Sequence, residues 1–155
     1  MKRRAFLQTV GLAAAASAVV TPTIAFAAET PKGPNEMGLE AALKAITGGK
    51  KVTPSDKVHL KAPEIAENGA VVPVTVDVDS PMTPDDYIKA IHIFATKNSN
   101  VRTADIMLTP ANGVATFATR IKLGSTQEVL VVAETSKGEF LSASQSIKVT
   151  IGGCG

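Results

Sequence analysis

Hydrophobic and polar residues alternate in short runs from about residue 57 to the end of the chain, and turn-forming residues separate the runs. The clearest run, AVVPVTVDVD at 70–79, places every second valine on one face of a strand: Val72, Val74, Val76 and Val78. Pro73 predicts an edge strand or a bulge, because proline has no N–H for a sheet ladder. Further strands are expected within 57–62, 87–97, 103–110, 113–123, 127–136 and 139–151.

Turn-forming residues predict how these runs are connected. Ser136, Lys137 and Gly138 predict a tight hairpin between the last two strands. The stretch PEIAENG at 63–69 is expected to be a loop. In the last strand, Ile147, Val149 and Ile151 alternate with polar residues, and the strand is expected to stop where the glycines begin.

Only one helix is expected near the start of the domain, within 35–49. Its hydrophobic residues recur at helical spacing, with Asn35 as N-cap and Gly48 as the stop signal. The hydrophobic set is Met37, Leu39, Leu43 and Ile46. About seven short strands with one helix predict an immunoglobulin-like antiparallel β-sandwich, mainly β, with a short N-terminal helix.

The first 27 residues have the three parts of an export signal. Three basic residues, Lys2, Arg3 and Arg4, precede an apolar run, and Ala25-Phe26-Ala27 forms an A-x-A cleavage site. The adjacent arginines followed by Ala-Phe-Leu resemble a twin-arginine signal. We therefore expect a signal peptide at 1–27, a sandwich domain at 28–151 and a flexible arm at 152–155, with the mature protein in the periplasm.

The charge pattern changes once the signal is set aside. The signal holds three of the 16 basic residues and none of the 14 acidic ones, so the remaining chain is close to neutral. It has no cluster of Lys and Arg and few aromatic residues, which argues against nucleic-acid binding. No membrane anchor is expected after cleavage.

Candidate catalytic groups are few. His59 and His92 each fall inside a predicted strand, where a partly buried imidazole with a hydrogen-bond partner is the favoured interpretation. No metal site is specified, and no nucleophile motif such as G-x-S-x-G or C-x-x-C occurs. The stretch Thr83-Pro84-Asp85-Asp86 could hold paired carboxylates, but a helix start with Thr83 as N-cap fits it better. These features argue against a self-sufficient enzyme.

The single cysteine, Cys154, lies one residue from the end of the sequence, among Gly152, Gly153 and Gly155. These glycines predict a thin, mobile tether that can carry a thiol into a partner's pocket. A solvated thiol is a modest nucleophile at neutral pH, so its activation must come from the partner. The chemistry of a covalent carrier fits this pattern.

Three other interpretations of Cys154 stay open, and the simplest is a thiol with no role. A single cysteine in an oxidising compartment can form an intermolecular disulfide, which would make the chain an immunoglobulin-like interaction protein tethered to a partner. A thiol peroxidase or oxidoreductase is less well supported, since a resolving cysteine and a base are missing.

The signal, the short helix, the stretches APEIAENGAVVPVTVDVDSPM and YIKAIHIFATKN, and the ending VTIGGCG resemble the SoxY family of the bacterial thiosulfate-oxidising (Sox) system. The resemblance spans essentially the whole chain, and GGCG is its most specific part. The family ends in G-G-C-G-G, one glycine more than this sequence.

The resemblance implies a carrier with no cofactor of its own, on which sulfur intermediates are bound covalently to Cys154. A haem c enzyme, SoxAX, would attach thiosulfate, and the manganese hydrolase SoxB would release sulfate. The sulfane dehydrogenase SoxCD could oxidise the remaining sulfur in some hosts. The resemblance also implies a heterodimer with SoxZ.

Overall fold

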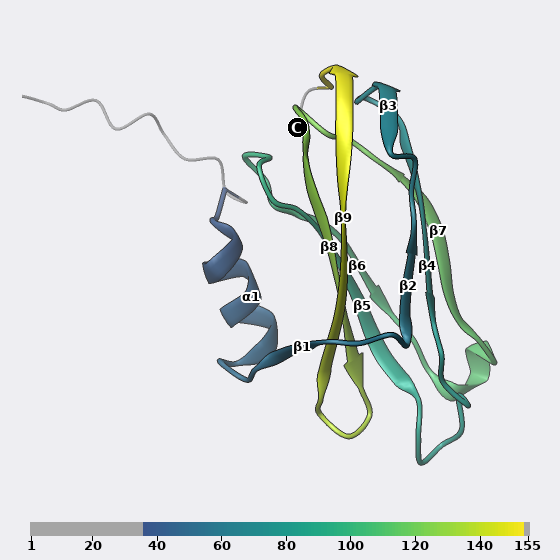
Figure 1. The fold of residues 1–155 in the computed structure, drawn as a ribbon. Coiled ribbons are helices and arrows are strands. Elements are labelled where there is room, and N and C mark those ends of the chain that lie inside the picture. Colours follow the sequence, from purple (N-terminus) through teal and green to yellow (C-terminus); the bar gives the residue numbers. More distant parts are fainter. Residues whose placement is uncertain (1–35, 154–155) are drawn as a thin grey trace, which may run out of the picture. The chain divides into compact units, whose positions relative to one another are not determined.

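The computed structural model describes residues 36–153. The predicted signal peptide and two arm residues, Cys154 and Gly155, lie outside the described residues. The described part contains one α-helix, one 3-10 turn and nine strands, so the prediction of a mainly β fold with a short helix is confirmed (Figure 1). The elements are α1 (Leu39–Thr47), β1 (Val52–Pro54), β2 (Val58–Lys61), β3 (Ile65–Asn68), β4 (Val72–Val78), β5 (Ile88–Ala95), β6 (Arg102–Met107), η1 (Pro110–Asn112), β7 (Ala115–Ile121), β8 (Gln127–Thr135) and β9 (Phe140–Ile151).

Two sheets form the sandwich. The larger follows the order β1-β9-β8-β5-β6, with β3 also paired to β9, and the smaller follows β2-β4-β7. Most pairs are antiparallel, as predicted, but β1 and β3 each run parallel to β9. The long last strand therefore pairs with β8 along one edge and with both β1 and β3 along the other.

The main core lies between the two sheets. Val72, Val74, Val76 and Val78 are all buried in it, which confirms the face predicted from their alternation. Pro73 lies in a central strand, yet the pairing of β4 with β2 begins only at Thr75. At Pro73, β4 therefore pairs with β7 alone, so the missing N–H is tolerated as it would be at an edge.

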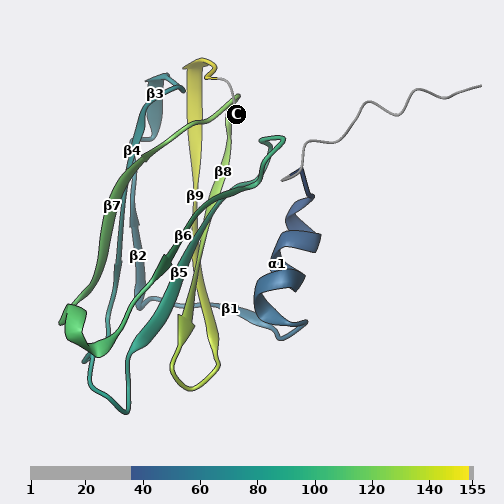
Figure 2. The same cartoon turned by 180° about the vertical axis from the view of Figure 1, so that it is seen from behind.

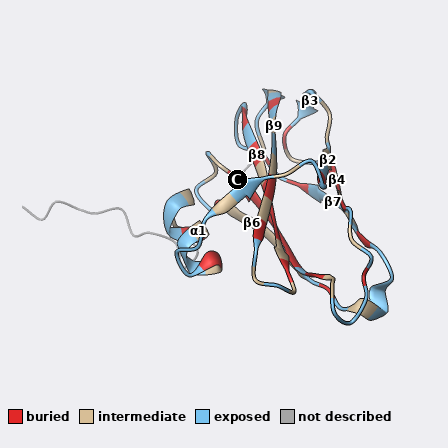
Figure 3. Ribbon diagram, turned by 60° about the horizontal axis from the view of Figure 1, so that its bottom comes forward, coloured by how far each residue is buried: buried red, intermediate tan, exposed pale blue. Residues whose placement is uncertain are grey.

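A second, smaller core lies between α1 and the outer face of the larger sheet (Figure 2). It contains Ala42 of the helix and four buried sheet-side residues: Phe94, Val101, Val132 and Phe140. The helix ends at Gly48 in the left-handed conformation (φ 62°), as predicted. It begins at Leu39 with Gly38 as N-cap, later than expected. Figure 3 shows that buried residues follow the long strands while much of the surface of α1 is exposed.

The prediction of a loop at 63–69 is wrong, because residues 65–68 form β3. This strand has no clean alternation of its own and exists because β9 offers a free edge: Lys148 N–H donates to Glu64 O at 2.9 Å. The sequence does not predict β1 either, because this strand of three residues also forms by pairing with β9.

The predicted helix start at 83–86 is also wrong. Asp86 N–H donates to both the carbonyl oxygen and the hydroxyl of Thr83, at 3.1 and 3.2 Å, which closes a tight turn. The threonine therefore makes its capping bond, but β5 begins at Ile88 and leaves no room for a helix. The hairpin at 136–138 is confirmed, with Gly138 at φ 80° and its N–H donating to Thr135 O.

Candidate functional site at the end of the last strand

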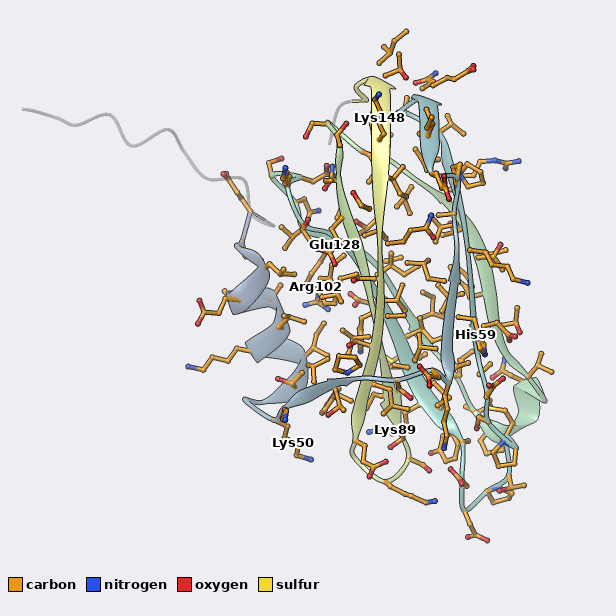
Figure 4. All side chains as sticks on the ribbon, in the orientation of Figure 1. Lys50, His59, Lys89, Arg102, Glu128 and Lys148 are labelled. Carbon is orange, nitrogen blue, oxygen red and sulfur yellow. The ribbon has the colours of Figure 1, made fainter. Side chains whose placement is uncertain are left out.

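The last strand leads the chain out of the core toward the predicted arm. Ile147 of β9 is fully buried, Val149 packs against the main core, and Ile151 is 67% exposed. The strand ends at Ile151, as the glycines predicted. Lys148 marks this end of β9 in Figure 4, where β3 runs beside it.

Three backbone hydrogen bonds join the end of β9 to two neighbouring segments. Gly69 N–H donates to Ile151 O at 2.7 Å, and Leu123 N–H donates to Gly69 O at 2.7 Å. Gly153 N–H then donates to Leu123 O at 2.9 Å. Each such bond contributes about 0.5–1.5 kcal/mol net. The three bonds link the start of the arm, the turn after β3 and the loop after β7 into one closed circuit.

The backbones in this circuit lie too close together for side chains. A Cβ built on Gly153 would lie 2.6 Å from both N and Cα of Ala70, and one on Gly69 would lie 2.8 Å from Gly153 N. A Cβ on Gly152 would collide with the carbonyl oxygen of Gly124. Only glycine fits at these three positions without a shift of the backbone around it.

Two side chains hold the loop after β7 in place. Asn98 Nδ2 donates to Lys122 O at 2.8 Å, and its Oδ1 accepts from Gly124 N–H at 3.0 Å. Gln127 Nε2 donates to the same Oδ1 at 2.8 Å and to Ser125 O at 3.1 Å. Gln127 is 2% exposed, so this network ties the loop to the interior.

The structure thus brings Gly152 and Gly153 together with residues that the sequence did not single out: Gly69, Leu123, Asn98 and Gln127. These lie far apart in the sequence and share no motif, so no local pattern could have identified them. Gly152 is exposed and Gly153 is half-buried. The prediction that Cys154 is the attachment site stays a prediction, because that residue lies outside the described part.

The two histidines differ from each other. His59 lies on β2 and is exposed, with Nε2 3.0 Å from Asp79 Oδ2. His92 on β5 is buried, with Nδ1 2.6 Å from Asp105 Oδ1, and its Nε2 has no hydrogen-bond partner among the described residues. The expectation of a partnered, partly buried imidazole therefore describes neither one fully.

Asp105 carries two strong contacts at the edge of the larger sheet. Its second oxygen, Oδ2, lies 2.6 Å from Arg102 Nη2. Partial burial disfavours the charged carboxylate, but the hydrogen bonds from His92 and Arg102 outweigh it and hold the pKa of Asp105 below its ordinary value. This cluster braces β5 against β6 and lies on other elements than the glycine circuit.

Among residues 36–153, no group of three or more His, Cys, Asp or Glu side chains is placed to hold a metal ion. Asp85 and Asp86 lie in the turn before β5, and Asp86 pairs with Lys137 Nζ at 3.0 Å. Within the same residues, no helix has the length and apolar character needed to cross a membrane.

Comparison with solved structures supports both the fold and the family. The sulfur carrier protein SoxY from Chlorobium limicola f thiosulfatophilum is 33% identical and aligns over 73% of this chain and 96% of its own, with a TM-score of 0.62. A superoxide reductase (neelaredoxin) from Ignicoccus hospitalis is 20% identical over 74% of this chain and 89% of its own, with a TM-score of 0.51. The latter likeness shows a shared fold only.

Comparison of sequences gives a second line of evidence. No curated protein matches the chain. The family model for sulfur oxidation protein SoxY matches residues 43–154, a range that contains every strand of the sandwich and reaches the cysteine. The chain therefore belongs to the SoxY family of sulfur carrier proteins.

Proposed function

We propose that this protein is a periplasmic sulfur carrier that holds the intermediates of thiosulfate oxidation covalently on Cys154 and presents them to partner enzymes. The observation that carries the proposal is the position of that thiol. It follows, by three residues, a strand that is anchored in the core at Ile147 and ends at Ile151. The family match extends to the same cysteine.

The chemistry begins with an oxidative coupling. The Cys154 thiolate and thiosulfate form a new sulfur–sulfur bond, giving a cysteine S-thiosulfonate, and two electrons pass to the haem c enzyme SoxAX. Water then attacks the terminal sulfone group on the manganese hydrolase SoxB. Sulfate leaves and a persulfide stays on the protein. SoxCD, where the host has it, would oxidise that sulfane sulfur to a sulfone group, with the oxygen atoms taken from water and the electrons passed to the haem of that enzyme.

In this series of reactions, the carrier positions the sulfur intermediates and keeps them bound. A covalent adduct does not diffuse away, and the next enzyme meets it at a concentration set by protein encounter. Three exposed hydrophobic side chains border the end of the domain from which the thiol leaves. They are Ile65 on β3, Val71 on the turn after it and Ile151 on β9. A partner that takes the thiol must approach this end, and exposed apolar surface favours such contacts.

Association with SoxZ completes the proposal. The pair would be a heterodimer, and a twin-arginine signal at 1–27 would let it cross the membrane already folded.

The variant Cys154→Ser tests the assignment, because it removes the thiol and keeps the size of the side chain. In a reconstituted Sox system we expect it to abolish thiosulfate-dependent electron transfer while its unfolding curve stays that of the wild type. Gly155→Ala is the matched control, since it alters the arm but keeps the thiol. Retained turnover in Cys154→Ser would refute the carrier role. A stable reducible dimer as the working state would favour the disulfide tether instead.

A further inference from the structure

The glycines at the start of the arm raise a question that flexibility alone does not answer. Among the described residues, the glycines with positive φ are Gly48, Gly49, Gly113 and Gly138. Gly152, Gly153 and Gly69 are not in this set, so their backbone conformations are open to other residues. The need for glycine at these three positions is therefore steric.

The steric need comes from close backbone packing on both sides of the arm. Gly153 lies against Gly69 and Ala70, where an added Cβ would meet backbone atoms at 2.6–2.7 Å. Gly152 lies against the carbonyl of Gly124. Real Cβ atoms essentially never approach a neighbour closer than 3.0 Å, and backbone atoms cannot rotate away as a flexible side chain can. Any side chain here would push the arm off the domain.

The packed backbones are also hydrogen-bonded into the protein. The circuit Ile151–Gly69–Leu123–Gly153 fixes the arm from two directions, with distances of 2.7–2.9 Å. Leu123 is 0% exposed and packs in the main core, and this packing fixes the position of its carbonyl group. On the other side, Asn68 Oδ1 accepts from Ala70 N–H at 2.9 Å and orders the turn after β3.

We infer that residues 69–70 and 123–124 form a seat that holds the first two arm residues, Gly152 and Gly153, against the carrier's own domain. Asn98 and Gln127 are positioning residues, since they fix the loop that supplies half of the seat. This inference rests on the proposed carrier function and deepens it. The backbone is therefore fixed to the domain as far as Gly153, the residue that precedes the thiol in the sequence.

The seat has a consequence for partner enzymes. An extended chain gains only about 3.3–3.6 Å per residue, so a seated arm presents the thiol close to the domain surface. A partner must then accept the turn after β3 and the loop after β7 near its entrance, or release Gly153 from Leu123 to draw the thiol deeper.

Amide order parameters from nuclear magnetic resonance test the seat in the full exported chain. Rigid backbone gives values of about 0.85 and flexible backbone gives values below about 0.6. We expect Gly152 and Gly153 to match the residues of β9, and Gly155 to fall below about 0.6. Values below about 0.6 at Gly153 in the wild type would overturn the inference.

Variants identify the contacts responsible. Gly153→Ala should break the seat and make the amide at 153 exchange with solvent at least about tenfold faster, while Gly155→Ala, the matched control, should leave the amide of Gly153 protected. Asn98→Ala should also raise exchange at Gly153 without altering exchange in the core of β8. It serves as a second test, because Asn98 is half-buried and belongs to neither hydrophobic core, so its loss should leave the fold intact. Unchanged exchange at position 153 in both variants would overturn the inference.

The seat and the carrier function can fail separately. Cys154→Ser should leave the order parameters at Gly153 unchanged. If that variant keeps its turnover while Gly153 stays rigid, the carrier function fails and the seat stands. If turnover is lost but Gly153 is mobile in the wild type, the carrier function stands and the seat fails.

Discussion

At the scale of single residues, Asp105 is a carboxylate with two close charged or titratable partners. Its two carboxylate oxygens lie 2.6 Å from His92 Nδ1 and 2.6 Å from Arg102 Nη2, on the side of the larger sheet that α1 covers. His92 is buried, so its pairing with Asp105 occurs in a less polar setting than that of His59 with Asp79 on the surface. The two His–Asp pairs provide a comparison within one chain.

The variant Asp105→Asn removes the negative charge that both partners face. We expect it to lower the free energy of unfolding by about 1–3 kcal/mol, as for hydrogen bonds to charged groups that leave a buried partner behind. Asp79→Asn is the matched control and should change it by less than about 1 kcal/mol, because that pair is solvent-exposed. Chemical denaturation measures both, and equal effects would contradict the account.

The same cluster predicts a dependence on pH. The pKa of Asp105 is lower in the folded chain than its ordinary value of 3.8, so its contribution to stability is present above about pH 4 and is lost as the pH falls through the lowered pKa. The stability difference between wild type and Asp105→Asn should therefore be largest near neutral pH and shrink below about pH 4. A difference that stays constant from pH 7 to pH 2 would contradict this assignment.

At this scale the sequence pattern indicates Cys154 as the candidate site, but it does not indicate which residues contact the glycines that precede it. Cys154 is recognisable in the sequence because it is the single cysteine and glycines flank it. The contact between Gly153 and Leu123 depends on three segments that meet only in the folded sheet. A steric requirement for glycine looks the same in a sequence as a requirement for flexibility.

At the scale of elements, strands with their own alternation were predicted and strands without it were not. β4 was identified from its valines, whereas β3 and β1 are short and take their structure from the free edge of β9. The turn at 83–86 shows a related limit. Its threonine makes the hydrogen bond of a helix cap, and only the position of β5 decides that no helix follows.

The docking of α1 gives a prediction at this scale. Ala42 is 0% exposed and faces the second core, whereas Ala45 of the same helix is exposed. Ala42→Leu should overpack that core and lower the free energy of unfolding by about 1–3 kcal/mol. Ala45→Leu makes the identical change on the outer face and should have an effect within about 0.5 kcal/mol. Thermal or chemical unfolding compares the two, and similar losses would show that the helix does not pack as described.

At the scale of the described domain, the residues that stabilise the fold and the residues proposed for chemistry lie in different parts of the chain. The sandwich supplies two cores and a long last strand, and the candidate chemistry follows the end of that strand. The glycine circuit connects these two parts, because it ties the start of the arm to the turn after β3 and the loop after β7. Under the proposed carrier function, the sandwich is the stable body that carries the thiol, and the groups that activate the thiol would belong to the partner enzymes.

Intact-protein mass spectrometry, before and after treatment with thiosulfate and a haem-containing periplasmic fraction, tests the central claim most directly. We predict adducts with the mass of a thiosulfonate or of added sulfur atoms, removed by reductant and mapped to Cys154 by fragmentation of the C-terminal peptide. Cys154→Ser should acquire none. A C-terminal peptide that appears only as a free thiol, or only cross-linked to another protein, would contradict the account.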